Sequence, residues 1–285
     1  MTKLLQSYCL GKWFATPEPN YDVHCAVTGR LVASGGTSGI DFSSVLDHAR
    51  NTGGPALRQM TFHERALAVK DLAKAIMARK EELYELSRET GATRGDSWID
   101  IEGGAGTLFT MSSKARRELP DDVVFLDGEM EPIGKTGQFV GHHIYSSLQG
   151  AGILINAFNF PVWGMLEKLG PALIAGMPVI IKPAMQSAQV AEHAFRIMLE
   201  AGVLPEGALQ LLVGDVGDLL DHLSCQDVVS FTGSAATAMK LQANPVIARE
   251  SVRFIAERDS LNASVLGPDS GPETPEFNLF VKEVV

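Results

Sequence analysis

Side chains able to do chemistry stand where predicted strands end. Lys182 and Glu257 directly follow apolar strands, Asn159 lies in the loop after another, and Gly233-Ser234 separates a fourth strand from the helix after it. In open parallel sheets a ligand binds beyond the carboxyl ends of the strands. We therefore expect an amide, an amine, a carboxylate and a hydroxyl to meet along one edge of a sheet.

Asn159 and Glu257 suit the chemistry of a carbonyl carbon. The Asn159 amide, which we expect to be partly buried, can donate a hydrogen bond to an oxygen that gains charge during nucleophilic attack. A turn closed by its own side chain is the alternative, and the sequence leaves the two open. Glu257 can act as a general base whose pKa is raised by a half-buried setting. A surface carboxylate is the alternative, and the strand-end position favours the base.

Gly233-Ser234 and Lys182 suit a nucleotide. Free N–H groups and a hydroxyl at the positive end of a helix dipole can hold a diphosphate, although a helix cap is the more frequent role of such a pair. Lys182 can bind ribose hydroxyls or attract a phosphate. Without further context a surface lysine is the favoured interpretation.

Strands and helices alternate from residue 152 onward. Short apolar runs predict buried strands, and helical patterns follow them. The predicted strands lie at 153–155, 179–181, 209–213, 228–231 and 251–256, with helices at 163–175, 188–201, 216–223 and 235–243. This order predicts an α/β fold with a Rossmann-like, doubly wound parallel sheet.

The region before residue 152 has a different pattern. Residues 1–50 predict strands and loops, and a capping box at Thr61-Phe62-His63-Glu64 predicts the start of a helix. Residues 96–118 predict a further helical region. Alternation over 137–155, with a turn near Gln149-Gly150, predicts a protruding β-hairpin that either packs on a partner subunit or stands exposed on a monomer.

Composition excludes several classes of protein. The chain has 285 residues, 45% hydrophobic and 20% charged, and a formal net charge of -10, so we expect no nucleic-acid partner. No apolar run approaches the ~20 residues that span a bilayer, which predicts a cytoplasmic protein without membrane contact. Cys9, Cys25 and Cys225 form no CxxC pair and have no local base, so we expect no disulfide, no metal site and no nucleophile among them.

Together, these motifs resemble the aldehyde dehydrogenase superfamily over essentially the whole chain. The resemblance rests on Asn159-Phe160-Pro161, Lys182-Pro183, Phe231-Thr232-Gly233-Ser234 and Glu257, in that order and spacing. Further stretches resemble one subgroup, the bifunctional ring-opening proteins of phenylacetate degradation: Gly91-Ala92-Thr93-Arg94, Asp96-Ser97-Trp98, Asp100-Ile101-Glu102-Gly103-Gly104, Asp218-Leu219-Leu220-Asp221 and Asp259-Ser260-Leu261-Asn262.

The resemblance implies an N-terminal dehydrogenase joined to a C-terminal hydratase-like domain that hydrolyses oxepin-CoA. The dehydrogenase would oxidise the resulting CoA-linked semialdehyde, and the protein would form a homo-oligomer. Within this chain it implies an N-terminal part of the cofactor-binding domain at 1–136, an oligomerisation hairpin with the first sheet strand at 137–156, a Rossmann-like core at 157–267, and the start of a catalytic domain at 268–285.

The resemblance also assigns roles to residues. Asn159 would bind the oxyanion, and Glu257 would activate the water that hydrolyses a thioester intermediate. Lys182 would contact the adenosine ribose, and Gly233 with Ser234 would lie at the diphosphate. The remaining cofactor contacts would come from Asn156, Phe158, Ala184, Met185, Gly214 and Thr232.

Three departures from the family pattern concern the cofactor. Phe158 stands where a tryptophan is common, which removes an indole donor near the diphosphate. Ala184-Met185 replaces Ser-Glu, so the carboxylate that would grip the ribose and repel a 2′-phosphate is absent, and we expect NADP in preference to NAD. Arg258-Asp259-Ser260 replaces Gly-Gly-Lys, and Ala238 stands where a glycine is common.

The family's nucleophilic cysteine follows the glutamate by some tens of residues, and none of the three cysteines matches its motif. A helix predicted from Thr274-Pro275-Glu276 is still running at Val285, so we expect a fragment of a longer dehydrogenase. The alternatives are an inactive nucleotide-binding fragment and a dehydrogenase for a related CoA semialdehyde of benzoate degradation.

Overall fold

A seven-stranded sheet forms the centre of the computed structural model, which describes residues 2–259 and 263–284. Its strand order is β12-β11-β8-β9-β10-β2-β3, and the first five of these strands run parallel. The bounds are β2 Ser7–Cys9, β3 Lys12–Phe14, β8 Gly152–Ile155, β9 Val179–Lys182, β10 Leu209–Leu211, β11 Val228–Thr232 and β12 Arg253–Glu257. The predicted parallel sheet is confirmed, and β2 and β3 extend it with antiparallel pairing.

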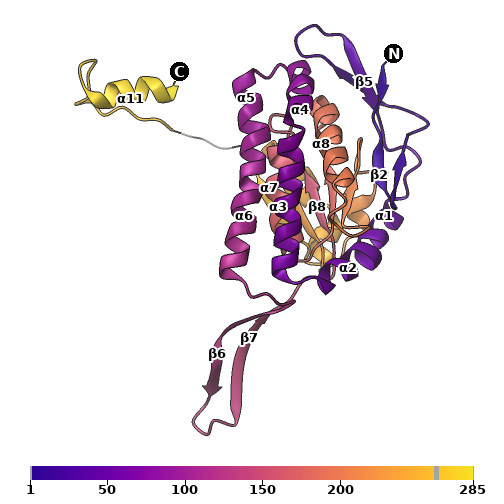
Figure 1. Cartoon of the computed structure of the whole chain (residues 1–285), viewed down its shortest axis with the longest axis vertical. Coiled ribbons are helices and arrows are strands. Elements are labelled where there is room, and N and C mark those ends of the chain that lie inside the picture. Colours follow the sequence, from indigo (N-terminus) through magenta and orange to yellow (C-terminus); the bar gives the residue numbers. More distant parts are fainter. Residues whose placement is uncertain (1, 260–262, 285) are drawn as a thin grey trace.

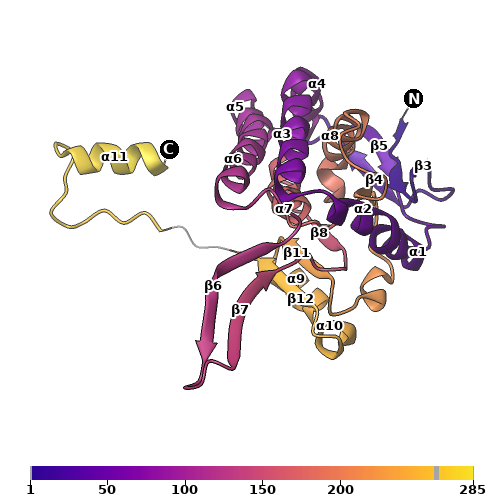
Figure 2. The ribbon, with the colours of Figure 1, turned by 60° about the horizontal axis from the view of Figure 1, so that its bottom comes forward.

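Helices cover both faces of the sheet, as Figures 1 and 2 show. One core includes Leu154 and Ile181 and lies under α2 Gly54–Gln59, α3 Phe62–Ala78, α4 Lys80–Ser87, α6 Gly104–Glu118, α7 Trp163–Ile174 and α8 Ala188–Glu200. The other includes Ile153, Ile155 and Ile180 and lies under α1 Phe42–His48, η5 Leu219–His222, α9 Ala235–Gln242 and α10 Pro245–Arg249. Successive strand residues point to opposite faces, which explains why these strands are apolar throughout.

The N-terminal region is more helical than the sequence predicts. Strands β1 Lys3–Leu4, β4 Tyr21–His24 and β5 Leu31–Gly35 form a small sheet. Helix α1 then begins after Asp41, whose carboxylate accepts from the N–H groups of Ser43 and Ser44. This cap was missed, and with it α1, the π-helical turn η1 Ala49–Gly53 and α2. The capping box of Thr61 and Glu64 at the start of α3 is confirmed.

Residues 88–103 form short helical pieces between α4 and α6. They are the 3₁₀ turn η2 Arg88–Thr90, helix α5 Arg94–Trp98 and the π-helical turn η3 Ile99–Gly103. The wide turn ends at Gly103 and Gly104, which lie against Trp163: a Cβ added at Gly103 would be 2.5 Å from the indole ring. Close packing against Trp163 therefore requires glycine at these two positions.

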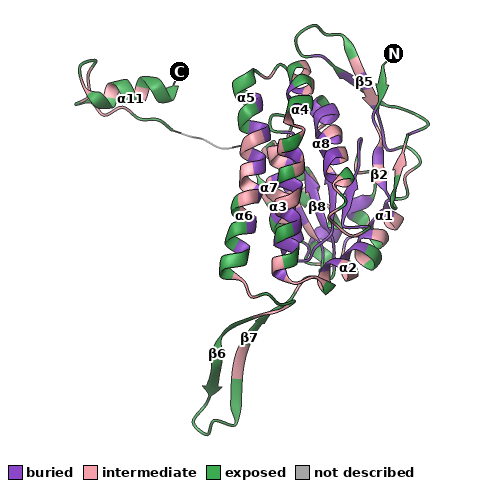
Figure 3. Cartoon of the chain, in the orientation of Figure 1, coloured by how far each residue is buried: buried purple, intermediate pink, exposed green. Residues whose placement is uncertain are grey.

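The β-hairpin begins earlier than the sequence predicts. It consists of β6 Phe125–Ile133 and β7 Phe139–Tyr145, whereas β8 pairs with β9 and β11. The predicted hairpin turn at Gln149-Gly150 is therefore wrong, because β6 carries acidic residues, Gly128 and Pro132, which hide its alternation. The hairpin projects from the body and is exposed over nearly its whole length (Figure 3).

Residues 275–284 form a separate amphipathic helix. Helix α11 Pro275–Val284 begins where Thr274-Pro275-Glu276 predicts, and it carries no buried residue. Residues 260–262 and Val285 lie outside the described residues, so the Ser260-Leu261-Asn262 part of the resemblance has no structural counterpart here. Every helix within 2–259 and 263–284 is too short or too polar to cross a membrane.

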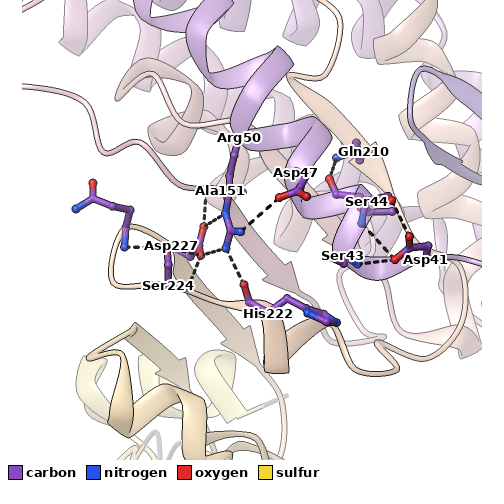
Figure 4. Close-up of polar contacts among 12 residues, drawn as sticks. Asp41, Ser43, Ser44, Asp47, Arg50, Ala151, Gln210, His222, Ser224 and Asp227 are labelled. Carbon is purple, nitrogen blue, oxygen red and sulfur yellow. Dashed lines mark hydrogen bonds and ion pairs between the residues drawn. The ribbon is translucent and has the colours of Figure 1, made fainter.

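A buried carboxylate ties the amino ends of β8 and β11 to η1. Asp227 accepts from the N–H of Ala151 at 2.8 Å and from the N–H of Ser224 at 2.7 Å. Arg50 forms an ion pair with the same carboxylate and also donates to the carbonyl oxygen of His222 at 2.9 Å (Figure 4). Asp227 is fully buried, and its charge is balanced by one guanidinium and several N–H donors.

We expect Asp227→Ala to lower the free energy of unfolding by about 3–5 kcal/mol, because it leaves Arg50 and two backbone N–H groups without their acceptor. Urea unfolding followed by circular dichroism measures this loss. Asp47→Ala is the matched control, since Asp47 approaches the same guanidinium at 3.9 Å from an exposed position. That control should cost under about 1 kcal/mol. Equal losses in the two variants would contradict the role of Asp227.

Candidate functional site

The hydrogen-bonded register brings the predicted site residues to one edge of the sheet. Ile155 at the end of β8 lies opposite Lys182 on one side and Phe231 on the other. Thr232 lies opposite Glu257, and its hydroxyl donates to the Glu257 carboxylate at 3.1 Å. The register therefore brings the strand ends together along the carboxyl edge, as expected.

Asn159 and Glu257 line the same cavity. The cavity has a volume of about 360 Å³, and its wall comes from the loop after β8, the start of α7 and the ends of β11 and β12. Its lining residues are Ile99, Ala157, Asn159, Phe160, Trp163, Gly164, Glu167, Thr232 and Glu257. A small carbonyl compound in this space can lie near both the amide and the carboxylate.

The exposure of these two side chains differs from the sequence expectation. Both Asn159 and Glu257 are exposed, not half-buried. Glu257 is the last residue of β12, an edge strand with nothing paired on its outer side among the described residues. The half-burial expected to act on Glu257 is absent because no described segment covers this end of the sheet.

A second, larger cavity of about 960 Å³ lies on the other side of the Asn159 loop. Phe158, Asn159 and Met185 contribute to its wall, together with β4 and the segment at 90–96. Asn159 thus stands between two cavities. The loop that carries it is fixed from one side by Ser187, whose hydroxyl donates to the carbonyl oxygen of Phe158 at 2.8 Å.

Asp100 fixes the other side of this loop. Its buried carboxylate accepts from the N–H of Val162 at 3.1 Å and from the N–H of Trp163 at 2.7 Å, which are free donors at the start of α7. Burial raises the pKa of Asp100 to about 7, although the two N–H donors act in the opposite direction. Asn159 lies three residues before Val162, so Asp100 helps to set its position.

The part of the edge beyond β8 and β9 contains a lysine and a buried amide. Lys182 ends β9, and burial lowers the pKa of its amine while nearby Asp215 opposes that shift. Asn156 follows β8 and is 5% exposed, and neither atom of its side-chain amide has a hydrogen-bond partner among the described residues. A buried amide without partners is costly, so Asn156 is suited to a polar ligand or a bound water.

The start of α9 already holds an internal anion. Ser234 caps the helix by accepting from the N–H of Thr237, and Gly233 donates its N–H to the carbonyl oxygen of Glu257 at 3.1 Å. The Asp259 carboxylate accepts from the N–H of Ala235 at 3.2 Å. Gly233-Ser234 therefore acts as a cap here, and the helix start does attract a negative charge.

The remaining predicted positions lie close to this edge. Ala184 precedes the 3₁₀ turn η4 Met185–Ser187, and Met185 is buried in the core. Gly214 follows β10 with a φ of 156, and a Cβ there would lie 2.8 Å from the Thr37 nitrogen. A side chain at Gly214 would therefore collide with the segment that precedes α1.

The three cysteines stand away from the cavity between Asn159 and Glu257. Cys9 and Cys25 are buried in β2 and after β4. Cys225 is exposed, but it precedes β11 and so lies toward the opposite edge of the sheet. Within the described residues, no cysteine contributes to the wall of this cavity.

Two functional candidates were missed from the sequence. Asp100 has no local signal, because its partners Val162 and Trp163 are distant in sequence. Glu167 lines the cavity and pairs with Lys168 at 2.7 Å, and the Lys168 side chain is only 9% exposed. For Glu167, the available signal was its spacing from Phe160 and Trp163, at helical intervals along the start of α7.

The chain belongs to the aldehyde dehydrogenase family, whose model matches residues 13–271. It is 41% identical to a 3,4-dehydroadipyl-CoA semialdehyde dehydrogenase of Aromatoleum evansii over 284 residues, covering 99% of this chain and 55% of that protein. It is 32% identical to a 3-sulfolactaldehyde dehydrogenase of Priestia aryabhattai, covering 67% of this chain and 38% of the relative. The chain spans about half the length of the curated relatives it matches.

Solved structures show the same fold. A betaine aldehyde dehydrogenase of Staphylococcus aureus in complex with NAD+ has a TM-score of 0.77 and 20% identity, covering 90% of this chain and 50% of that one. A 3,6-anhydro-L-galactose dehydrogenase in complex with NADP has a TM-score of 0.76 and 21% identity, covering 89% and 52%. The predicted fold and family are confirmed.

We expect the free energy of unfolding to depend on pH through the titration of Asp100. Because its folded-state pKa of about 7 lies above the usual aspartate value, folding takes up a proton between about pH 4 and 7. The free energy of unfolding should therefore fall, relative to Asp100→Asn, as pH rises through this range, and the difference should level off above about pH 8. Urea unfolding at several pH values measures it.

Asp96→Asn is the control with the opposite sign. Hydrogen bonds from Thr93 lower the pKa of Asp96, so its stabilising contribution is lost as pH falls through the folded-state value. A difference between the native chain and Asp100→Asn that does not change with pH would show that burial does not act on Asp100 in this way.

Proposed function

We propose that this chain forms the cofactor-binding side of an aldehyde dehydrogenase that oxidises a CoA-linked semialdehyde to the acid with NADP. The observation that carries the proposal is the cavity shared by Asn159 and Glu257 at the carboxyl edge of the sheet. Family membership supports the reaction type. The 41% identity to a 3,4-dehydroadipyl-CoA semialdehyde dehydrogenase supports a CoA-linked semialdehyde from aromatic degradation.

Asn159 and Glu257 have different roles in the reaction at the carbonyl carbon. The Asn159 amide donates to the carbonyl oxygen as that oxygen gains charge during nucleophilic attack. The Glu257 carboxylate takes a proton from the water that hydrolyses the covalent intermediate. Thr232 holds the orientation of that carboxylate by donating its hydroxyl to it at 3.1 Å.

The residues of the nearby edge fit a dinucleotide. The unpartnered amide of Asn156 and the amine of Lys182 supply hydrogen-bonding groups beside the start of α9, which attracts negative charge. NADP, when bound, accepts a hydride from the substrate. Met185 supplies no carboxylate where a 2′-phosphate would meet repulsion, which is why NADP is proposed in preference to NAD.

The attacking thiolate is proposed to come from a residue other than Cys9, Cys25 and Cys225. Their places, two buried and one toward the opposite edge, do not allow contact with a carbonyl beside Asn159. The alternative is that the chain binds a dinucleotide without turnover. Aldehyde-dependent NADPH formation by the full-length gene product separates the two.

The substrate can come from more than one aromatic compound. We propose a phenylacetate-derived CoA semialdehyde as the substrate and a hydratase-like domain as a partner. The relative's 3,4-dehydroadipyl-CoA semialdehyde supports the alternative, a shorter semialdehyde from a related route.

We also propose a cytoplasmic homo-oligomer. The exposed apolar side chains of β6 and β7, such as Met130 at 64% and Phe139 at 74% exposure, suit contact with a second copy.

We expect Glu257→Gln to lower kcat for semialdehyde oxidation in the full-length gene product by about 10²–10⁴-fold, because glutamine cannot accept the proton. The Kd for NADP, measured by fluorescence titration, should stay unchanged. Glu250→Gln is the control, since Glu250 precedes β12 and lies toward the amino edge of the sheet, whereas the cavity lies at the carboxyl edge. Full activity of Glu257→Gln would refute the role of Glu257.

We expect this chain to bind NADP at least about tenfold more tightly than NAD, a difference of about 1.4 kcal/mol. Isothermal titration calorimetry measures both Kd values. Met185→Glu should shift the ratio toward NAD by restoring a carboxylate near the ribose. Met185→Gln, of matched size without the charge, should keep the NADP preference. Tighter binding of NAD to the unchanged chain would refute the proposal.

A further inference from the structure

Gly164 leaves a gap in an otherwise complete wall of side chains. Phe160, Trp163, Gly164 and Glu167 follow one another at helical intervals, so they lie on one face at the start of α7, and all four line the cavity with Asn159. Gly164 continues the helix, since its N–H donates to the carbonyl oxygen of Phe160 at 2.9 Å. Three of the four positions fill space, and Gly164 alone does not.

Packing among the described residues does not require this glycine. A Cβ added at Gly164 would meet nothing within 4 Å, whereas a Cβ at neighbouring Gly103 or Gly104 would lie within 3 Å of Trp163. The backbone of Gly164 needs no left-handed conformation, because it is not among the residues with positive φ. A glycine inside a helix lowers stability relative to alanine, so its presence here needs another reason.

The open space beside Gly164 belongs to the cavity, because Gly164 is part of the cavity wall. A side chain at this position would point into the volume of about 360 Å³ that holds the substrate carbonyl beside Asn159. Apolar groups of Phe160 and Trp163 flank the gap. The gap therefore suits the apolar part of an acyl chain that extends away from the aldehyde group, with the Glu167 carboxylate one turn further along the same wall.

We propose that Gly164 determines substrate specificity by keeping the cavity wide enough for the acyl chain of a CoA thioester. This rests on the proposed function, and it adds the reason why a semialdehyde joined to a bulky carrier is accepted. A short free aldehyde needs no such space. Gly164 acts through the room that it leaves and touches no reacting atom.

The test compares two substrates in the full-length gene product: the CoA thioester of adipate semialdehyde and free propanal. Gly164→Leu should lower kcat/KM for the CoA thioester at least about tenfold relative to kcat/KM for propanal, since leucine fills the gap. Gly106→Leu is the matched control. It changes another helix glycine with open space around its Cβ, and Gly106 lies outside the cavity wall. This control should leave the ratio unchanged.

Stability separates the proposed role from a structural one. Gly164→Ala should raise Tm by about 1–2 °C while lowering kcat/KM for the CoA thioester less than leucine does. A lower Tm for Gly164→Ala, or an equal loss on both substrates for Gly164→Leu, would overturn the proposal. If the unchanged enzyme oxidises propanal but not the CoA thioester, the proposed function fails, and the role of Gly164 fails with it. If the unchanged enzyme oxidises both and Gly164→Leu keeps their ratio, only the role of Gly164 fails.

Discussion

The register between β8 and its two neighbours is the constraint on which the site depends. Parallel pairing places Ile155 level with Lys182 and Phe231, and a shift by one residue would turn every side chain of β8 to the other face of the sheet. Asp227 acts at the far end of the same strands, where it accepts from the N–H of Ala151. A buried carboxylate at the amino edge thus helps to set which groups meet at the carboxyl edge.

The two edges of the sheet use polar groups in opposite ways. At the amino edge, the donors around Asp227 are satisfied within the chain. At the carboxyl edge, the amide of Asn156 is buried and has no partner within the part of the chain that the structure describes, and Asn159 and Glu257 are exposed. Satisfied polar groups stabilise a fold, whereas unsatisfied ones are suited to bind a ligand. This difference supports the site proposed at the carboxyl edge.

The sequence was sufficient where a pattern is local. Apolar runs followed by glycine and helix caps predicted five parallel strands, and strand ends then predicted which residues meet. Three features depend on distant segments and were beyond reach. The hydrogen bond from Val162 to Asp100 joins residues that are far apart in sequence. The exposure of Glu257 depends on which segments cover an edge strand. The acidic residues of β6 hid its pairing with β7. Local sequence patterns predict helices and strands, whereas the burial of a residue depends on packing between distant segments.

At the start of α9, the Asp259 carboxylate competes with any external anion for the backbone N–H groups of the helix. It occupies the N–H of Ala235, so any external anion that binds there must first displace a charge belonging to the protein itself. Binding of that anion and attachment of Asp259 are then mutually exclusive, and each weakens the other by the same factor. The end of β12 and the residues that follow it, which carry Glu257 and Asp259, would thereby respond to binding at the proposed nucleotide site.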